Sequence, residues 1–162
     1  MTTILAIDPG NIESGWTLID TDTCRPLRFG KTENRQLHDL FGDLDPDVAV
    51  IEMIASYGMA VGATVFETCV WIGRFAETLE FGHAIGTELV KRLPVKLHHC
   101  HTAKAKDSNI TQALVDRFAS DQSNHGKGTK AAPGFFYGFK ADIWQAFALA
   151  VYAADTQAGV TF

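Results

Sequence analysis

Three acidic residues stand where a carboxylate could bind a cation. Asp8 follows a short apolar run at 4–7 and precedes a Pro-Gly pair, so it ends a predicted buried strand. Glu52 ends a second run at 48–51, and Asp142 lies in the first turn of an apolar helix near the C-terminus. A carboxylate at the mouth of a buried strand is costly unless it is paired or binds a cation. Three that converge stay ionised together only if a divalent cation neutralises them.

This residue set indicates phosphodiester hydrolysis. Two divalent ions about 4 Å apart activate water and stabilise the leaving oxygen, and Mg²⁺ needs only a few carboxylates because it keeps several waters. Asp8 would bridge the two ions, with Glu52 on one and Asp142 on the other. Gln145 lies one helical turn after Asp142 on the same face, and its neutral amide would weaken the second ion site. For Asp8 alone, the alternative is a turn aspartate that caps its own Pro-Gly loop.

Three segments carry a resemblance to a known family. They are residues 4–15 (ILAIDPGNIESG), the strand that ends in Glu52, and residues 141–150 (ADIWQAFALA). With these segments in this order, the chain resembles the RuvC-type Holliday-junction resolvases of the ribonuclease-H-like superfamily. The resemblance covers nearly the whole length of the chain. The segments 65–75 and 104–110 look closer to the phage-encoded branch than to the cellular one.

The resemblance implies a function and a site. Asp8, Glu52 and Asp142 fall on the family's active-site positions, while Gln145 departs from the further acid that the family usually carries there. The implied activity is Mg²⁺-dependent cleavage of branched DNA, foremost four-way junctions, leaving a 5′-phosphate and a 3′-hydroxyl. Mn²⁺ is a possible substitute for Mg²⁺. The family works as a symmetric homodimer, and the predicted helix at 63–82 is the interface candidate.

The expected fold is an α/β domain over residues 1–162, with a mixed five-stranded sheet and helices on both faces. The predicted strands lie at 3–8, 14–20, 25–30, 48–52 and 95–100. The predicted helices lie at 35–42, 63–82 with more helix to about 92, 103–119 and 138–155. Residues 120–137, rich in Ser, Asn, Gly and Lys, are expected to form a long loop of the kind that tends to be functional.

The charge distribution points to a polyanion. The net charge is −5, yet residues 83–140 hold nine Lys or Arg against four acids, so the remainder carries −10. A solvated basic face without a partner is the alternative. The candidate phosphate contacts are Lys104, Lys106, Lys130 and Lys140, which would position DNA without reading its sequence. Tyr57 and Met59, just past Glu52, are candidates for stacking at a junction, or else fold onto the core.

Several other classes are disfavoured. No apolar run reaches the length of a bilayer span and no leader pattern is present, so a cytoplasmic protein is expected, in the bacterial host if the chain is phage-encoded. The three cysteines are too scattered for a disulfide framework. The cluster at 98–101 (HHCH) could offer a zinc ion at most two ligands on one side of a strand.

Three rival functions differ in chemistry. The first is a catalytically weakened or inactive junction-binding homologue, because Gln145 replaces an acid. The second is a nuclease of the same fold that acts on RNA, hybrid or other branched nucleic acid. An actin-like kinase also opens with a strand, Asp and Gly, but it needs two such domains. Asp107 is expected to be a capping or salt-bridged residue in the first turn of its helix, where the helix dipole favours an acid. The alternative is that it serves as a substitute catalytic acid.

Overall fold

The computed structural model describes residues 1–157 and is built around one mixed sheet with the strand order β3-β2-β1-β4-β5. Strand β1 pairs antiparallel with β2 and parallel with β4, β2 pairs antiparallel with β3, and β4 pairs parallel with β5. The bounds are β1 Thr3–Asp8, β2 Glu13–Asp20, β3 Pro26–Glu33, β4 Val48–Met53 and β5 Gly86–Lys91. The predicted α/β class with five strands is confirmed.

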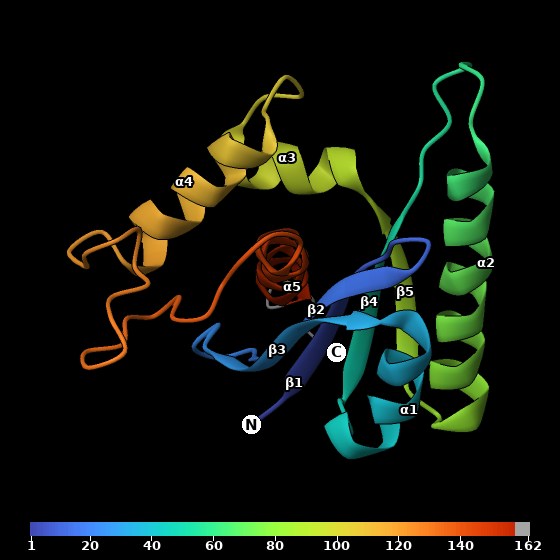
Figure 1. Ribbon diagram of the computed structural model, residues 1–162, viewed down its shortest axis with the longest axis horizontal. Coiled ribbons are helices and arrows are strands. Elements are labelled where there is room, and N and C mark those ends of the chain that lie inside the picture. The colour runs from blue at the N-terminus through green and yellow to red at the C-terminus, as the bar shows by residue number, and fades with distance from the viewer. Residues whose placement is uncertain (158–162) are drawn as a thin grey trace.

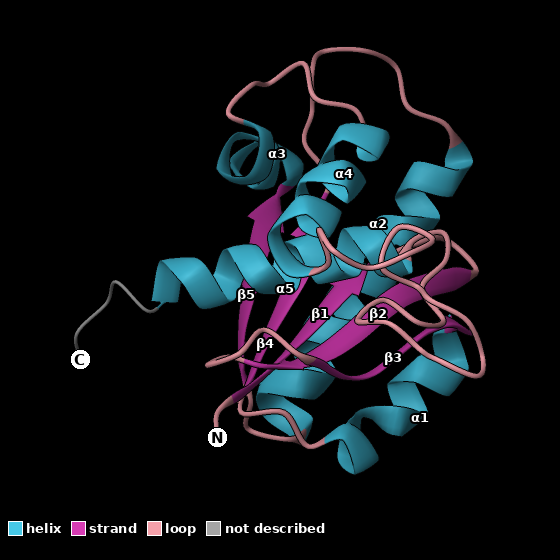
Figure 2. Ribbon diagram, turned by 90° about the vertical axis from the view of Figure 1, so that its left-hand side faces the viewer, coloured by secondary structure: helices cyan, strands magenta, loops and turns pink. Residues whose placement is uncertain are grey.

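Helices cover both faces of this sheet. Helices α1 and α2 lie on one face, and α5 crosses the strands on the other, with α3 and α4 beyond it (Figures 1 and 2). Their bounds are α1 Asn34–Leu44, α2 Ala63–Glu77 with the wider turn η1 Thr78–Gly82, α3 Arg92–Cys100, α4 Asp107–Phe118 and α5 Ile143–Gln157. Among the described residues, no helix combines the length and apolarity needed to cross a membrane.

Strand β1 is buried on both sides. Ile4 and Ala6 belong to the core cluster under α5, whereas Leu5 and Ile7 belong to the cluster under α1 and α2, and all four are fully buried. Alternate residues of a strand face opposite ways, so a continuous apolar run serves both cores. The strand therefore places Asp8, its last residue, at the edge of two apolar layers.

The fifth strand lies earlier in the chain than predicted. Residues 86–91 form β5, where helix was expected, and the expected strand at 95–100 is part of α3. Strand β5 is at the edge of the sheet and buries only Val90, so its apolar pattern is weak. Pro94 is the third residue of α3, where a missing N–H costs the helix nothing. The prediction that helix ends near residue 92 and a strand follows at 95–100 is therefore wrong, because this proline lies in the first turn of a helix.

Other predicted boundaries need smaller corrections. Helix α4 begins at residue 107, and its predecessor α3 ends at 100, so the predicted start at 103 is too early. Helix α5 begins at Ile143 and not at the predicted 138, so the loop predicted at 120–137 extends over residues 119–142. Asp142 therefore precedes the helix instead of lying inside its first turn. Its carbonyl accepts a hydrogen bond from the Ala146 N–H at 3.0 Å, so it caps the start of α5.

Gly15 allows this helix start to approach the sheet. It lies opposite Asp8 on β2, and a Cβ at this position would stand 2.6 Å from the carbonyl carbon of Asp142. Only a residue without a side chain permits such an approach. The glycine thus fixes how closely Asp142 can lie to the end of β1.

We expect Gly15→Ala to destabilise the protein by about 1–3 kcal/mol, the usual range for forced overpacking. The added methyl must displace backbone and not a flexible side chain. Gly86→Ala in β5 is the matched control, because nothing lies within 4 Å of a Cβ built there. Urea unfolding of both variants measures the effect. Equal unfolding free energies for the two variants would contradict the close approach.

Candidate active site

Asp8 and Glu52 leave the sheet side by side. Their strands β1 and β4 are parallel neighbours, and Ile7 is in register with Ile51. The next residue on each strand is therefore an acid at the same carboxyl edge. In open α/β sheets this edge is where ligands bind.

The neighbouring carboxylates change how Asp8 ionises. Burial raises the pKa of Asp8 most, and a side-chain hydrogen bond with Glu52 and the charges of Glu52 and Asp142 raise it further, to about 9. Arg92 acts in the opposite direction but does not outweigh these causes. Without a bound cation, Asp8 therefore keeps its proton at neutral pH. A group held in this state is typical of functional sites.

Asp142 completes the acidic set from the other side of the fold. Its carboxylate lies 2.9 Å from the ammonium of Lys31 on β3. This hydrogen bond and the charge of Asp142 raise the pKa of Lys31. Both side chains are partly exposed, with 31% and 45% of their surface accessible, so solvent screens the pair and the lysine can exchange partners.

Arg92 connects the remaining polar residues of the site. Its guanidinium donates to Oε1 of Glu52 at 3.3 Å and to Oε1 of Gln145 at 2.9 Å, and it also pairs with Oδ1 of Asp107. Burial alone would lower the pKa of Arg92, but the charges of Glu52 and Asp107 raise it above its ordinary value. The first residue of α3 therefore carries a permanent positive charge between three acceptors.

These groups surround a single cavity of about 370 Å³. Asp8, Glu52, Asp142 and Gln145, which the sequence analysis named, all line it. So does Tyr57, from the loop that follows β4. The other lining residues are Pro9, Met53, Ile54, Ala55, Arg92 and Asp107. The structure thus brings together five of the predicted site residues.

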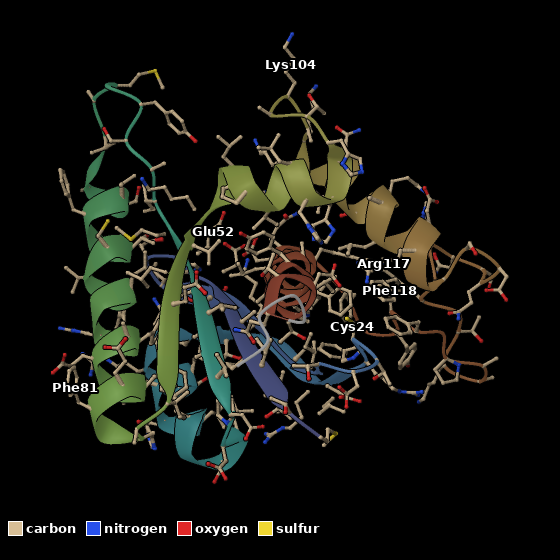
Figure 3. The ribbon with its side chains drawn as sticks, turned by 180° about the vertical axis from the view of Figure 1, so that it is seen from behind. Cys24, Glu52, Phe81, Lys104, Arg117 and Phe118 are labelled. Atoms are coloured by element: carbon tan, nitrogen blue, oxygen red, sulfur yellow. The ribbon has the colours of Figure 1, made fainter. Side chains whose placement is uncertain are left out.

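The predicted lysines and Met59 are exposed. Lys104 and Lys106 belong to the α3–α4 connection, Lys130 to the long loop, and Lys140 precedes Asp142 by two residues. Lys104 points away from the body of the protein (Figure 3). Met59 is 77% exposed, so it does not fold onto the core.

The carboxylates fit a hard cation only after a change of partners. Among residues 1–157, no group of three or more His, Cys, Asp or Glu side chains is arranged to hold a metal ion. Arg92 and Lys31 are bound to Glu52 and Asp142, while burial and the neighbouring carboxylates raise the pKa of Asp8 so that it keeps its proton. Carboxylate oxygens are the donors that Mg²⁺ prefers, and a cation would relieve the repulsion among these carboxylates. The donor chemistry therefore fits a divalent ion.

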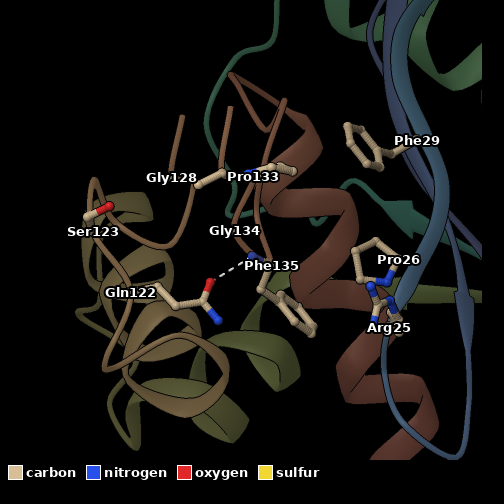
Figure 4. Close-up of a pocket in the computed structure, with 10 residues that line it drawn as sticks. Arg25, Pro26, Phe29, Gln122, Ser123, Gly128, Pro133, Gly134 and Phe135 are labelled. Atoms are coloured by element: carbon tan, nitrogen blue, oxygen red, sulfur yellow. Dashed lines mark hydrogen bonds between the residues drawn. The ribbon is translucent and has the colours of Figure 1, made fainter. Parts of the chain in front are cut away.

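A larger cavity, of about 500 Å³, lies away from these acids between β3 and the long loop (Figure 4). Arg25 is the one charged group among its ten lining residues, and the amide oxygen of Gln122 is already engaged by the N–H of Phe135 at 2.7 Å. The lining contains no carboxylate and no histidine, so the Ser123 hydroxyl has no base among the lining residues, and the size of the cavity does not make it the active-site candidate.

No protein-family model matches the sequence, and no curated protein matches it. Among solved structures, RuvC of Thermus thermophilus matches with a TM-score of 0.69 and 14% identity, covering 98% of this chain and 97% of that chain. The same protein in complex with a Holliday junction substrate matches with a TM-score of 0.66 and 11% identity over the same shares. At such identities the likeness concerns the fold. The chain has a RuvC-like fold.

The sequence analysis missed two residues of the site. Arg92 was counted only as part of a basic stretch, because the segment before it was expected to be helical. Residues 86–91 form a strand parallel to β4. Arg92, the residue after this strand, therefore emerges at the same edge of the sheet as Glu52. Lys31 gave no local signal, since it reaches Asp142 only through the pairing of β3 with β2. The predicted strand placement of the cluster at 98–101 is also wrong: residues 98–100 end helix α3 and His101 follows it, while His98 pairs with Asp155 and His99 with the Ala148 carbonyl.

We expect Asp8→Asn to stabilise the metal-free protein at high pH. A carboxyl with a folded pKa near 9 against 3.8 unfolded takes up a proton on folding, so wild-type stability falls as pH rises between these values. The Asn side chain of the variant does not ionise, so its stability does not fall with pH for this reason. Thermal melts in EDTA should show a gain for the variant that is larger at pH 8.5 than at pH 4.5. Asp121→Asn, at an exposed loop residue, is the control. An equal gain at both pH values would show that Asp8 ionises normally.

Proposed function

We propose that this protein is a metal-dependent endonuclease that cleaves branched DNA, foremost four-way junctions. The observation that carries the proposal is the convergence of Asp8, Glu52 and Asp142 at one edge of a RuvC-like sheet. One of the similar solved structures is described as a complex with a Holliday junction substrate. Fold alone does not establish a function, so the acidic cavity and the surrounding basic residues must supply the argument.

Each residue of the cavity would have its own role in binding the metal ion. Asp8, Glu52 and Asp142 would hold Mg²⁺, with Mn²⁺ as a substitute, and Gln145 faces the same cavity. When bound, a divalent cation makes water a nucleophile at neutral pH and stabilises charge on the phosphate. Asp8 would give up its proton as the cation arrives. Lys31 and Arg92 would keep the carboxylates from repelling one another before that.

The proposed reaction is hydrolysis at phosphorus. A water molecule attacks the scissile phosphate, the bond between phosphorus and the 3′ oxygen breaks, and the water's proton passes to the leaving oxygen by way of solvent. The products are a 5′-phosphate and a 3′-hydroxyl. No oxidant or further co-reactant is needed.

The DNA would approach over the basic surface near the cavity. Lys104, Lys106, Lys130 and Lys140 are exposed and free to contact phosphates, which position a duplex without reading sequence. Tyr57 and Met59 are 73% and 77% exposed on the loop after β4, and we propose that they stack at the opened centre of a junction.

Two related cuts in one junction would need two copies of the chain. We propose a homodimer formed through the outer face of α2, where Phe66 and Val70 are 63% and 54% exposed at an i, i+4 spacing. Phe81, at the end of the same helical segment, points outward as well (Figure 3). Large exposed apolar residues on one surface are typical of a protein interface.

A junction-binding protein without nuclease activity is the second candidate. One observation favours it: Arg92 and Lys31 already pair with the carboxylates that a metal ion would need. Binding and cleavage must therefore be measured separately.

We expect Asp8→Asn, Glu52→Gln and Asp142→Asn each to abolish cleavage of a labelled four-way junction and to leave junction binding intact. Metal ligands act on the transition state, whereas phosphate contacts lie on other residues. Cleavage and gel-shift assays, with and without Mg²⁺ or Mn²⁺, on junction, duplex and RNA–DNA hybrid give the measurement. Wild-type protein that binds the junction but cuts no substrate in either metal would establish the second candidate instead.

Variants at the exposed lysines test DNA binding separately from cleavage. Replacing Lys104, Lys106 and Lys130 by Ala should weaken junction binding and flatten its dependence on salt by up to about 0.9 units of logarithmic slope per lost phosphate contact. Arg35→Ala on α1, on the opposite face of the sheet, is the control. An unchanged slope in the triple variant would show that the local charge excess does not contact DNA.

We expect Phe66→Glu to convert a dimer into a monomer, because it places a charge in an apolar contact. Leu97→Glu on α3, which is 44% exposed, should leave the dimer intact. Sedimentation velocity of both variants and wild type provides the measurement. A monomeric wild type at micromolar concentration would refute the proposed interface.

A further inference from the structure

The guanidinium of Arg92 occupies a central position in the acidic cavity. It emerges at the start of α3, directly after β5, and reaches acceptors on three other elements: Glu52 on β4, Asp107 on α4 and Gln145 on α5. Its side chain is 27% exposed, so most of its surface is removed from water. Arginine remains charged at any accessible pH. The protein therefore carries a fixed cation inside its own site.

The charges around this cavity are balanced for one divalent ion. Four carboxylates are present, on Asp8, Glu52, Asp107 and Asp142, together with two cations, Lys31 and Arg92. With all groups ionised the site carries −2, which one divalent ion neutralises. A second ion would leave the same site with an excess of +2, and like charges held close together repel one another.

Gln145 agrees with this balance. It is buried, with 9% exposure, and its amide oxygen accepts the hydrogen bond from Arg92 at 2.9 Å. A neutral acceptor orients the guanidinium without adding negative charge. The amide oxygen of Gln145, which could otherwise ligate a second ion, is thus already hydrogen-bonded to Arg92.

Arg92 also faces a second cavity. It lines a neighbouring space of about 390 Å³ with Tyr57, Leu93, Lys96 and Ala103, so it stands at the boundary between the acidic cavity and a basic, partly apolar one. A phosphate that spans this boundary would meet the guanidinium on one side and the carboxylates on the other. Arginine's planar fork of N–H donors suits two phosphate oxygens at once.

We propose that Arg92 takes the place of a second metal ion, so that the site binds a single divalent cation and the guanidinium stabilises the negative charge on the phosphate. This inference rests on the proposed nuclease function. Fixed donors aimed at developing charge are worth large factors in rate, and an arginine can serve phosphoryl transfer in this way. The alternative is that Arg92 only ties α3 and α4 to the sheet.

The test counts bound ions directly. Electron paramagnetic resonance of Mn²⁺ titrated into the whole protein, without DNA, should give one bound ion per chain and no signal from a coupled ion pair. The double variant Arg92→Met with Gln145→Glu changes the charge of the site from −2 to −4 and should bind two ions. Arg117→Met is the matched control: it removes an arginine paired with Asp155 outside the cavity and should still bind one.

Cleavage kinetics give the second readout. Arg92→Met should lower kcat about 10²–10³-fold, the usual cost of losing one charge-stabilising donor, while Arg92→Lys retains part of the activity. A purely structural role would instead lower the melting temperature and leave kcat unchanged below it. Melting curves of each variant separate loss of fold from loss of function.

The outcomes are distinct. Two Mn²⁺ ions, or none, in the wild type overturn the inference, and so does an unaltered kcat in folded Arg92→Met. If the wild type cuts junctions but binds two ions, the nuclease proposal stands and the inference fails. If it binds one ion and cuts nothing in either metal, the nuclease proposal fails while the single-ion count remains.

Discussion

Like charges at the end of a buried strand are the constraint on which this structure depends. Strand β1 is covered by apolar layers on both faces. Asp8, its last residue, therefore lies at the edge of these layers, beside Glu52 and near Asp142. Repulsion and burial together raise the pKa of Asp8 to about 9. The fold therefore maintains an arrangement that opposes full ionisation, and a cation, bound or built in, is what relieves it.

The protein meets this constraint partly with its own residues. Lys31 comes from β3 at one edge of the sheet, and Arg92 follows β5 at the other edge. Each neutralises a carboxylate that the central strands and α5 present between them. Such internal pairing offsets part of the repulsion among the acids without a ligand. Among the described side chains, no group of three or more His, Cys, Asp or Glu is arranged to hold a metal ion.

The likeness to RuvC concerns backbone architecture at 11–14% identity. Architecture brings strand ends and a helix start together but leaves open which side chains stand there. In this chain an arginine and an amide adjoin three acids, a combination that the strand order alone does not require. The functional proposals rest on these residues and on the exposed lysines, and variants at the two sets can separate cleavage from binding.

The sequence by itself determined the α/β class, four of the five strands, the strand-end positions of Asp8 and Glu52, and the helix that follows Asp142. These succeeded because β1 and β4 are buried on both faces and α5 is buried almost all round, so their apolar runs are strong local signals. Edge strand β5 was misplaced, because one exposed face leaves little pattern and Pro94 begins a helix instead of ending one. Only the tertiary structure decided the surroundings of the acids. Arg92 and Lys31 reach them through strand pairing and packing between residues up to 111 positions apart, and no local pattern in a sequence records contacts over such separations.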